Sequence, residues 1–508
     1  MNGEVPISLA VIVAYVAICS IIGFAAKKFM GALTSAEYFL AGRKIGYFGA
    51  FMGAYTTMMS VFMFLGLPGL AYRTGIGVIT MAGSGPLMSF LMAFLWRKMR
   101  RLGNRFGYIT QADFLADRFY SQRFMRVLAA ICGILAISTG HFVVQFVGCG
   151  TVLSVITRGA IPYEVGIVVF AIMTMAYVLL GGMRATAWTD IFHGTWMLVS
   201  LITIFLIVLI LGVGRGLPEA FTLVASTEEA MVSLPGPGSY WTYQMIFSWF
   251  VSYPIVFFCC MPHMFIWSYA AKSEKVILLV AVLWIPATAI AEFLLPFAGV
   301  FGRIVFPTLP PSTSPDTIVP AMVLELSPYY WMVPLLMTGA FAAAISTAAG
   351  VMICMSGMLT RDITLLLRPQ TSEATLAWIG RAFVIVVSLV GIALAVRPPA
   401  IIAFMITASL VLVAPLVIPI LVGLLWPRLN REGALSGLIV SLTIGSWLTF
   451  APREWGGGFM AGPALLGFQP IVWALLASVV TTVVVTYLTP PPLKEVVERF
   501  FEKIPIVS

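Results

Sequence analysis

Long apolar runs constrain this sequence more than any other feature. Thirteen stretches of about 20 apolar residues follow one another, and a helix of that length spans the hydrocarbon core of a bilayer. Because 60% of all residues are hydrophobic and only 10% are charged, a water-soluble exterior is excluded. The sequence therefore predicts a single all-α integral membrane domain over residues 1–508. The predicted spans are residues 7–27, 48–72, 76–97, 125–156, 164–182, 186–214, 241–270, 276–301, 331–358, 376–396, 398–424, 434–450 and 468–489.

The basic residues predict how these spans are oriented. With the N-terminus outside, 23 of the 29 Lys and Arg residues fall on the inner side of the membrane. We therefore expect a multi-pass protein of the cell (inner) membrane with a cytoplasmic tail at residues 490–508. The net charge of +9 then reflects topology, so no nucleic-acid partner is predicted. The six cysteines all lie in apolar runs, which argues against disulfides or a metal cluster, and no catalytic motif indicates an enzyme.

Two of the spans carry helix-breaking residues at mid-depth. The second has three hydroxyls ahead of Pro68, and the seventh contains Pro254 and Pro262. A helix that breaks inside a bilayer must be buried in protein or line a cavity, because an unpaired amide in lipid is costly. We expect the second span to break near residues 56–60. The two spans open two groups of five, 48–214 and 241–424, an arrangement typical of inverted repeats in secondary transporters.

The ninth span carries two adjacent hydroxyls, Ser346 and Thr347, in an otherwise apolar run. Helical spacing puts both on the same face as the carbonyl of Ala343. Neutral oxygen atoms suit Na⁺ better than a divalent ion, which would require carboxylates. The alternative is that the hydroxyls bond back to a carbonyl one turn earlier or join two helices.

Other polar residues lie inside the predicted spans. His141 and Gln145, four residues apart, indicate either a hydrogen bond between helices or contact with a solute. Asp190 needs a partner, for which Arg184, Thr189 or a transported ion are the candidates. Glu292 has no evident partner and is expected either to face a cavity or to be protonated.

Five motifs together resemble the sodium/solute symporter family. They are EYFLAGRKIG (37–46), LGLPG (65–69), GGMRATAWTDIFHG (181–194), PHMFIWSYAAKSEK (262–275) and AAAISTAAGVMICMSGMLTRDI (342–363). The resemblance implies a five-plus-five inverted repeat with one extra helix before it and two after it. It also implies Na⁺ as the co-transported ion, held between the second and ninth spans. The implied ligands are the carbonyls of Thr56, Met59 and Ala343 and the hydroxyls of Ser346 and Thr347, with Asp190 on the ion path or at a second ion site.

The solute is expected between spans two, four and seven. Candidate contacts are Thr57, Ser60, His141, Gln145, Phe257, Phe258 and His263. The segment 262–275 is most similar to that of the monocarboxylate-type members, so the sequence predicts Na⁺-coupled import of a small organic acid by alternating access. Met261 stands where the proline carriers have Gln, which argues against proline.

Several alternatives stay open from the sequence. An amino acid or another small solute is the second choice for the cargo. A proton-coupled carrier would use Asp190 or Glu292 as its relay, and a solute-sensing receptor module is a third function. Besides the solute and the lipid bilayer, a small membrane accessory subunit is a partner to be tested.

Overall fold

The computed structural model describes residues 4–29, 34–309, 313–397, 402–451 and 465–502. Regular structure in these residues is helical, apart from one bridge between Ile45 and Ala271. Twelve of the described helical segments are long and apolar enough to cross a membrane. The predicted span 164–182 is not among the twelve, and a shorter apolar helix, Tyr163–Ala176, stands in its place. The predicted all-α membrane fold is confirmed.

The helices follow the predicted spans closely. The first half contains α1 (Glu4–Lys27), α2 (Ser35–Leu40), α3 (Tyr47–Val61), α4 (Leu67–Thr74), α5 (Gly85–Leu91), α6 (Arg97–Phe106), α7 (Gln111–Arg118), α8 (Phe124–Ala136), α9 (Val143–Ile156), α10 (Tyr163–Ile207) and α11 (Leu217–Thr227). Wider π-helical turns extend several of them, among them η2 (Phe62–Gly66) and η5 (Ile137–Phe142).

The second half contains α12 (Tyr243–Val251), η9 (Ser252–Val256), α13 (Phe257–Cys260), α14 (Pro262–Ala270), α15 (Glu274–Val305), α16 (Ile318–Leu326), α17 (Met332–Met358), η11 (Leu359–Thr364), α18 (Leu365–Leu367), α19 (Glu373–Ala395), α20 (Ile402–Val413), α21 (Val417–Leu425), α22 (Arg431–Phe450), α23 (Pro470–Leu488) and α24 (Lys494–Val497). All six cysteines are free and buried, as predicted.

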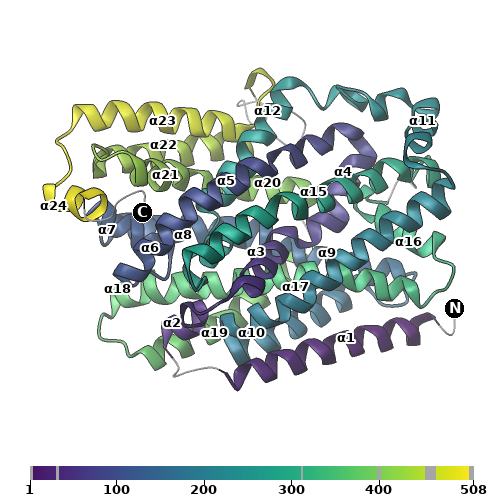
Figure 1. The fold of residues 1–508 in the computed structure, drawn as a ribbon, viewed down its shortest axis with the longest axis horizontal. Coiled ribbons are helices and arrows are strands. Elements are labelled where there is room, and N and C mark those ends of the chain that lie inside the picture. Colours follow the sequence, from purple (N-terminus) through teal and green to yellow (C-terminus); the bar gives the residue numbers. More distant parts are fainter. Residues whose placement is uncertain (1–3, 30–33, 310–312, 398–401, 452–464, 503–508) are drawn as a thin grey trace.

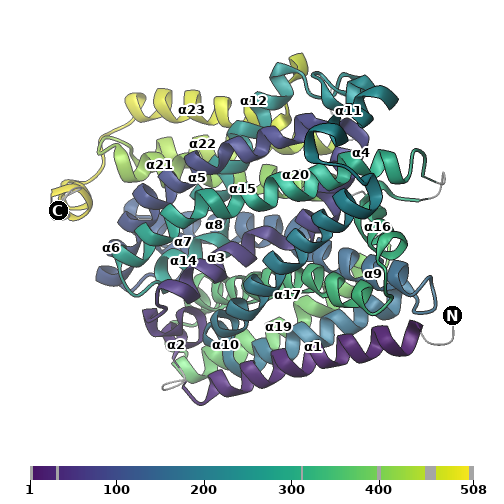
Figure 2. The same ribbon diagram turned by 45° about the vertical axis from the view of Figure 1, so that its right-hand side comes forward.

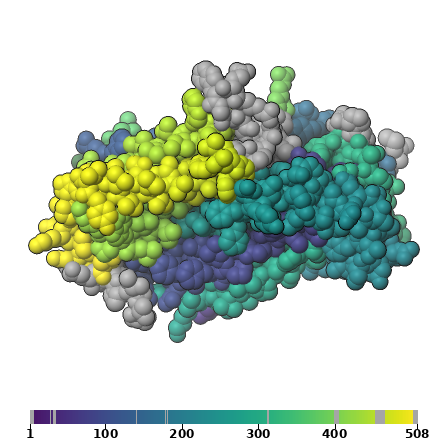
Figure 3. Space-filling model, turned by 90° about the horizontal axis from the view of Figure 1, so that it is seen from above, coloured from purple at the N-terminus to yellow at the C-terminus, as the bar shows by residue number. Residues whose placement is uncertain are grey.

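The second and ninth spans form the centre of the bundle. The most apolar windows of Tyr47–Thr74 and Met332–Leu367 are fully buried, whereas the window of Val5–Ala26 is only 22% buried. Figures 1 and 2 show α3 and α17 in the middle, α1 along one edge, and α22 with α23 at the opposite edge. Seen from the side of α23, the C-terminal helices in yellow share this face with the teal segment that contains α11 and α12 (Figure 3). The first helix and the last two thus flank a common core.

The second span breaks where the sequence predicts. Ser60 has φ 41° and ψ 173°, a conformation that residues other than glycine rarely adopt. Two amides next to the break lose the acceptors four residues earlier and donate to side chains, although that of Phe62 also donates to the carbonyl of Met59. The N–H of Val61 donates to Oε1 of Gln145 at 3.0 Å, and the N–H of Phe62 donates to Oγ of Ser60 at 3.0 Å.

The seventh span is broken as well. Between α13 and α14, Met261 is extended, with φ −67° and ψ 114°. Pro262 explains this, because its ring disfavours a helical conformation at the preceding residue and it has no N–H to donate. The helix α14 therefore begins inside the protein, and His263 is its second residue.

The fifth and sixth spans join at a sharp kink within α10. Gly182 has φ 51° there, and a Cβ at this position would lie 2.6 Å from the carbonyl oxygen of Tyr38. Glycine is required both by the positive φ and by the close approach of α2.

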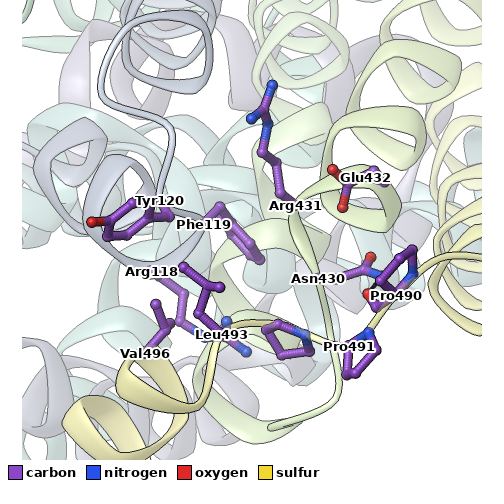
Figure 4. A pocket seen from close by; sticks show the side chains of 11 residues that line it. Arg118, Phe119, Tyr120, Asn430, Arg431, Glu432, Pro490, Pro491, Leu493 and Val496 are labelled. Carbon is purple, nitrogen blue, oxygen red and sulfur yellow. Dashed lines mark hydrogen bonds between the residues drawn. The ribbon is translucent and has the colours of Figure 1, made fainter.

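The segment around α7, the connection between α21 and α22, and the described part of the tail pack together. Arg118, at the end of α7, donates to the carbonyls of Gly423 and Trp426 at 2.8 and 3.0 Å. Arg499 pairs with Asp117 at 2.8 Å. Figure 4 shows Arg118 beside Leu493 and Val496, in a pocket that the prolines following α23 also line. The α24 region thus covers α7, while residues 503–508 of the predicted tail lie outside the described residues.

Candidate functional site

A cluster of buried oxygen atoms lies where α17 crosses α3. The Thr347 hydroxyl is 3.0 Å from the carbonyl oxygens of Ala343 and Thr57, and 3.3 Å from that of Thr56. The Ser346 hydroxyl donates to Oγ1 of Thr56 at 2.6 Å. Both hydroxyls are completely buried. The structure thus brings four of the five predicted Na⁺ ligand residues together.

The break in the second span explains why a carbonyl is free to join this cluster. In an unbroken helix the N–H of Val61 would donate to the carbonyl of Thr57, four residues earlier. Because Gln145 accepts that N–H, the Thr57 carbonyl is left for Thr347. The Thr57 carbonyl has thus lost its helical donor, and every carbonyl oxygen has two lone pairs, so the cluster keeps acceptor capacity that a cation can use.

Two details of this cluster differ from the sequence analysis. The Thr57 carbonyl was not predicted as an ion ligand. A helix break frees carbonyls in the turn that precedes it, so the break predicted near residues 56–60 was a signal that could have pointed to Thr57. The carbonyl of Met59 accepts the N–H of Phe62 and makes none of the contacts with Ser346 or Thr347 described above.

Asp190 lies beside the oxygen cluster on α10. Its carboxylate is completely buried, and it interacts electrostatically with the hydroxyls of Ser346 and Thr56. Nδ1 of His193 is 3.6 Å from Oδ1 of Asp190. Within the described residues, neither oxygen of this carboxylate makes a hydrogen bond of good geometry. The carboxylate therefore retains capacity to bind a cation.

Both structural partners expected for Asp190 are engaged elsewhere. Arg184 pairs with Glu37 at 2.6 Å, and the Thr189 hydroxyl donates back to carbonyls of its own helix at 3.0 Å. His193 takes their place because it lies three residues on, on the same helix face. Of the candidates that the sequence left open, neither Arg184 nor Thr189 is therefore the partner of Asp190 in this structure.

A second polar cluster is built around two buried histidines. The rings of His141 and His263 are 5.0 Å apart, and Phe257 lies 5.4 and 5.8 Å from them. Nδ1 of His141 is 2.7 Å from Oγ of Ser409 on α20. Both ring nitrogens of His263 are buried and, among the described residues, without a hydrogen-bond partner. An imidazole so placed has unused capacity for a polar ligand.

The other predicted solute contacts are already occupied. Gln145 caps Val61 with its oxygen, and its amide nitrogen donates to the carbonyl of His141 at 2.6 Å. The Thr57 hydroxyl accepts the indole N–H of Trp267 at 3.1 Å, and Ser60 caps the break.

Phe258 is also packed inside the protein. Its ring centroid lies 5.8 Å from that of Trp96 and 5.1 Å from that of Trp284. Of the predicted solute residues, His141, His263 and Phe257 are therefore the ones grouped around unsatisfied polar atoms.

The family of the chain is decided by its sequence. The model of the sodium:solute symporter family matches residues 38–441, which include both broken spans and the oxygen cluster. The chain belongs to this family. This membership and the similarity to sodium-coupled carriers show that the chain is a sodium-coupled solute symporter and that sodium is the co-transported ion. The family and these similar proteins are transporters and not enzymes.

Similar proteins cover nearly the whole chain. The sodium/pantothenate symporter of Escherichia coli is 27% identical over 454 residues, which cover 88% of this chain and 89% of that one. A sodium/proline symporter of Staphylococcus aureus is 26% identical over 503 residues, covering 97% of this chain and 94% of that one.

Two solved structures share the fold. A Na⁺-coupled sialic acid symporter in a substrate-bound, outward-open state has a TM-score of 0.79 at 19% identity, covering 96% of this chain and 98% of that one. A nucleobase-cation-symport-1 family transporter in a closed conformation has a TM-score of 0.61 at 16% identity, covering 92% of this chain and 98% of that one.

Proposed function

We propose that the oxygen cluster between α3 and α17 is the Na⁺ site. The ligands are the carbonyls of Thr56, Thr57 and Ala343 and the hydroxyls of Ser346 and Thr347. The three carbonyl oxygens lie within 3.3 Å of the Thr347 hydroxyl, and the Ser346 hydroxyl is 2.6 Å from Oγ1 of Thr56, which supports this assignment. So does the absence of a formal charge among them, which favours a monovalent ion over a divalent one. The carbonyl of Met59, which accepts the N–H of Phe62, stays a further candidate because it has a second lone pair.

We further propose Asp190 as a ligand of a second ion or as a station on the ion path. A buried carboxylate is costly inside a membrane unless a cation compensates it. Its position next to Ser346 and Thr56 supports the role, because an ion leaving the first site would pass within reach of Asp190.

The solute is proposed to be a small organic acid, bound by His141 and His263 with Phe257 against its apolar part. The observation that carries this proposal is the pair of unpartnered ring nitrogens on His263. A neutral imidazole can donate one N–H to a carboxylate, and the start of α14 adds the favourable end of a helix dipole. Pantothenate, proline and sialic acid, named for the similar carriers, also carry a carboxylate.

The coupling mechanism is proposed to be alternating access. An ion that bridges α3 and α17 binds more tightly to the conformation in which these helices lie close, so Na⁺ binding favours that conformation. The membrane potential adds about 2.3 kcal/mol per charge per 100 mV to inward transport. The proposed repeats are residues 48–214 and 241–424, with the N-terminus outside and the tail in the cytoplasm.

Uptake by proteoliposomes tests the function. We expect a radiolabelled short monocarboxylate such as acetate or pyruvate to accumulate only with an inward Na⁺ gradient, and the uncharged amide of the same acid not to compete. His263→Ala should raise the half-saturating solute concentration, whereas the half-saturating Na⁺ concentration, measured at a solute concentration that saturates the variant, should stay unchanged. Uptake that follows a proton gradient and ignores Na⁺ would refute the coupling proposal.

An amino acid is the second candidate solute, because sodium/proline symporters are among the similar proteins. Proline and pantothenate therefore belong in the same uptake panel. Saturable, Na⁺-dependent uptake of proline that short monocarboxylates do not inhibit would replace the organic-acid assignment.

A further inference from the structure

One buried carboxyl group plays no part in the sites described above. Glu292, in the middle part of α15, is 1% exposed. Neither of its carboxylate oxygens has a hydrogen-bond partner of good geometry in the part of the chain that the structure describes. An uncompensated charge at such a position costs several kcal/mol.

Among the described residues, two tyrosines interact with Glu292. Tyr253 of η9 lies close enough for its hydroxyl to interact with the carboxyl group, and Tyr55 of α3 is electrostatically coupled to it. The Tyr55 hydroxyl donates to the carbonyl of Ala287 at 3.1 Å, so it is already engaged. Tyr253 is therefore the neighbour with which the carboxyl group can form a hydrogen bond.

Among the described residues, no cation contributes to the electrostatic environment of Glu292. Arg73 of α4 interacts with Tyr240 instead. Several other cations of α15 and its neighbours also have partners elsewhere. Arg97 and Arg101 of α6 pair with Glu274 at the start of α15. Arg303, near the end of α15, stacks on the ring of Tyr72 at 4.4 Å. On α10, Arg184 pairs with Glu37, and Asp190 and His193 belong to the ion site.

A proline adds a second unpaired acceptor at the same residue. Pro296 lies inside α15 and has no N–H, so the carbonyl of Glu292, four residues earlier, lacks its helical donor. Glu292 thus presents unpaired acceptor atoms from both its backbone and its side chain in a buried position. A proton on the carboxyl group would remove the charge and supply a donor at once.

We propose that Glu292 is a proton-binding site of this symporter. In this conformation the carboxyl group is the neutral acid and faces the Tyr253 hydroxyl. It exchanges its proton with water in a conformation that hydrates this region. The step is proton binding alone: the carboxylate takes one proton from water, and no other bond forms or breaks. This inference does not depend on the identity of the solute.

The position of Tyr253 connects this proton to transport. Its ring centroid is 5.7 Å from that of Phe257, which lies against both His141 and His263. Because a bound proton stabilises the conformation in which Glu292 is buried, lower pH shifts the population toward that conformation. For one proton, the transport rate can change by at most about tenfold per pH unit.

Infrared spectroscopy of the purified transporter tests the proposal without any solute. We expect the C=O band of a protonated carboxyl group at neutral pH in the wild type. Glu292→Gln should lose this band, while Glu325→Gln, which removes an exposed acid of α16, should keep it. Identical carboxyl bands in the wild type and Glu292→Gln would mean that Glu292 is ionised, and would overturn the proposal.

A second variant decides the question if Glu292→Gln does not fold. Tyr253→Phe removes only the facing hydroxyl, so the band of a protonated Glu292 should move to higher frequency. An unmoved band would show that the absorbing acid is not the group facing Tyr253. Where Glu292→Gln does fold, its Na⁺-driven uptake should vary less with pH than that of Glu325→Gln, and an equal pH dependence would refute the link to transport.

Discussion

Removing the Thr347 hydroxyl should weaken Na⁺ binding without unfolding the protein. This hydroxyl lies within 3.3 Å of three carbonyl oxygens from two helices and is the most connected group of the oxygen cluster. A hydrogen bond or contact to a charged group is worth about 1.5–3 kcal/mol. Since about 1.4 kcal/mol corresponds to a tenfold change in affinity, Thr347→Ala should raise the half-saturating Na⁺ concentration roughly 10- to 100-fold.

The assay is uptake at constant solute concentration and membrane potential, with Na⁺ varied against choline. Thr347→Ser restores the hydroxyl and should recover most of the affinity. Ser356→Ala is the matched control, because Ser356 is a buried hydroxyl of the same helix whose bond, at 3.0 Å, goes to the carbonyl of Ile353 in α17 itself. The ion-site reasoning fails if Thr347→Ala, folded and inserted like the control, keeps the wild-type Na⁺ dependence.

Three further substitutions test the surrounding structure. Gly53→Ala should lower the melting temperature and reduce the free energy of unfolding by about 1–3 kcal/mol, because the new Cβ would lie 2.0 Å from the ring of Trp267. A stabilised variant would show that α3 and α14 separate easily. Gln145→Met should also lower the melting temperature, by about 1–3 kcal/mol, since it leaves the N–H of Val61 without its acceptor; scanning fluorimetry in detergent measures both. Asp190→Asn should fold normally yet reduce the steepness of uptake against Na⁺, and an unchanged curve would remove Asp190 from the ion path.

Local sequence chemistry was sufficient to predict the breaks. A proline disfavours helical geometry at the residue before it, so the two prolines of the seventh span predicted a break there, and the structure places it at Met261. The hydroxyls of the second span likewise predicted a break near Ser60, because side-chain oxygens can accept the backbone N–H groups that a break leaves without partners. The pairing of Ser346 and Thr347 with the carbonyl of Ala343 on one face was equally a consequence of helical periodicity.

Contacts between helices could not be predicted in this manner. Gln145 and Val61 are 84 positions apart, and nothing in either segment shows that the amide side chain of one caps the other. For Asp190, the sequence offered Arg184 and Thr189 as neighbours, whereas the kink at Gly182 brings Arg184 to Glu37 instead.

The sequence by itself determined that this chain lies in a membrane, where its spans run and which of them are interrupted. These properties follow from apolar length, from proline and from hydroxyl placement along a single helix. Only the tertiary structure decided which carbonyls are free to bind an ion and which histidine nitrogens lack partners. Hydrogen-bonding capacity at those atoms depends on what a distant segment donates or accepts, and helical periodicity carries no information about that.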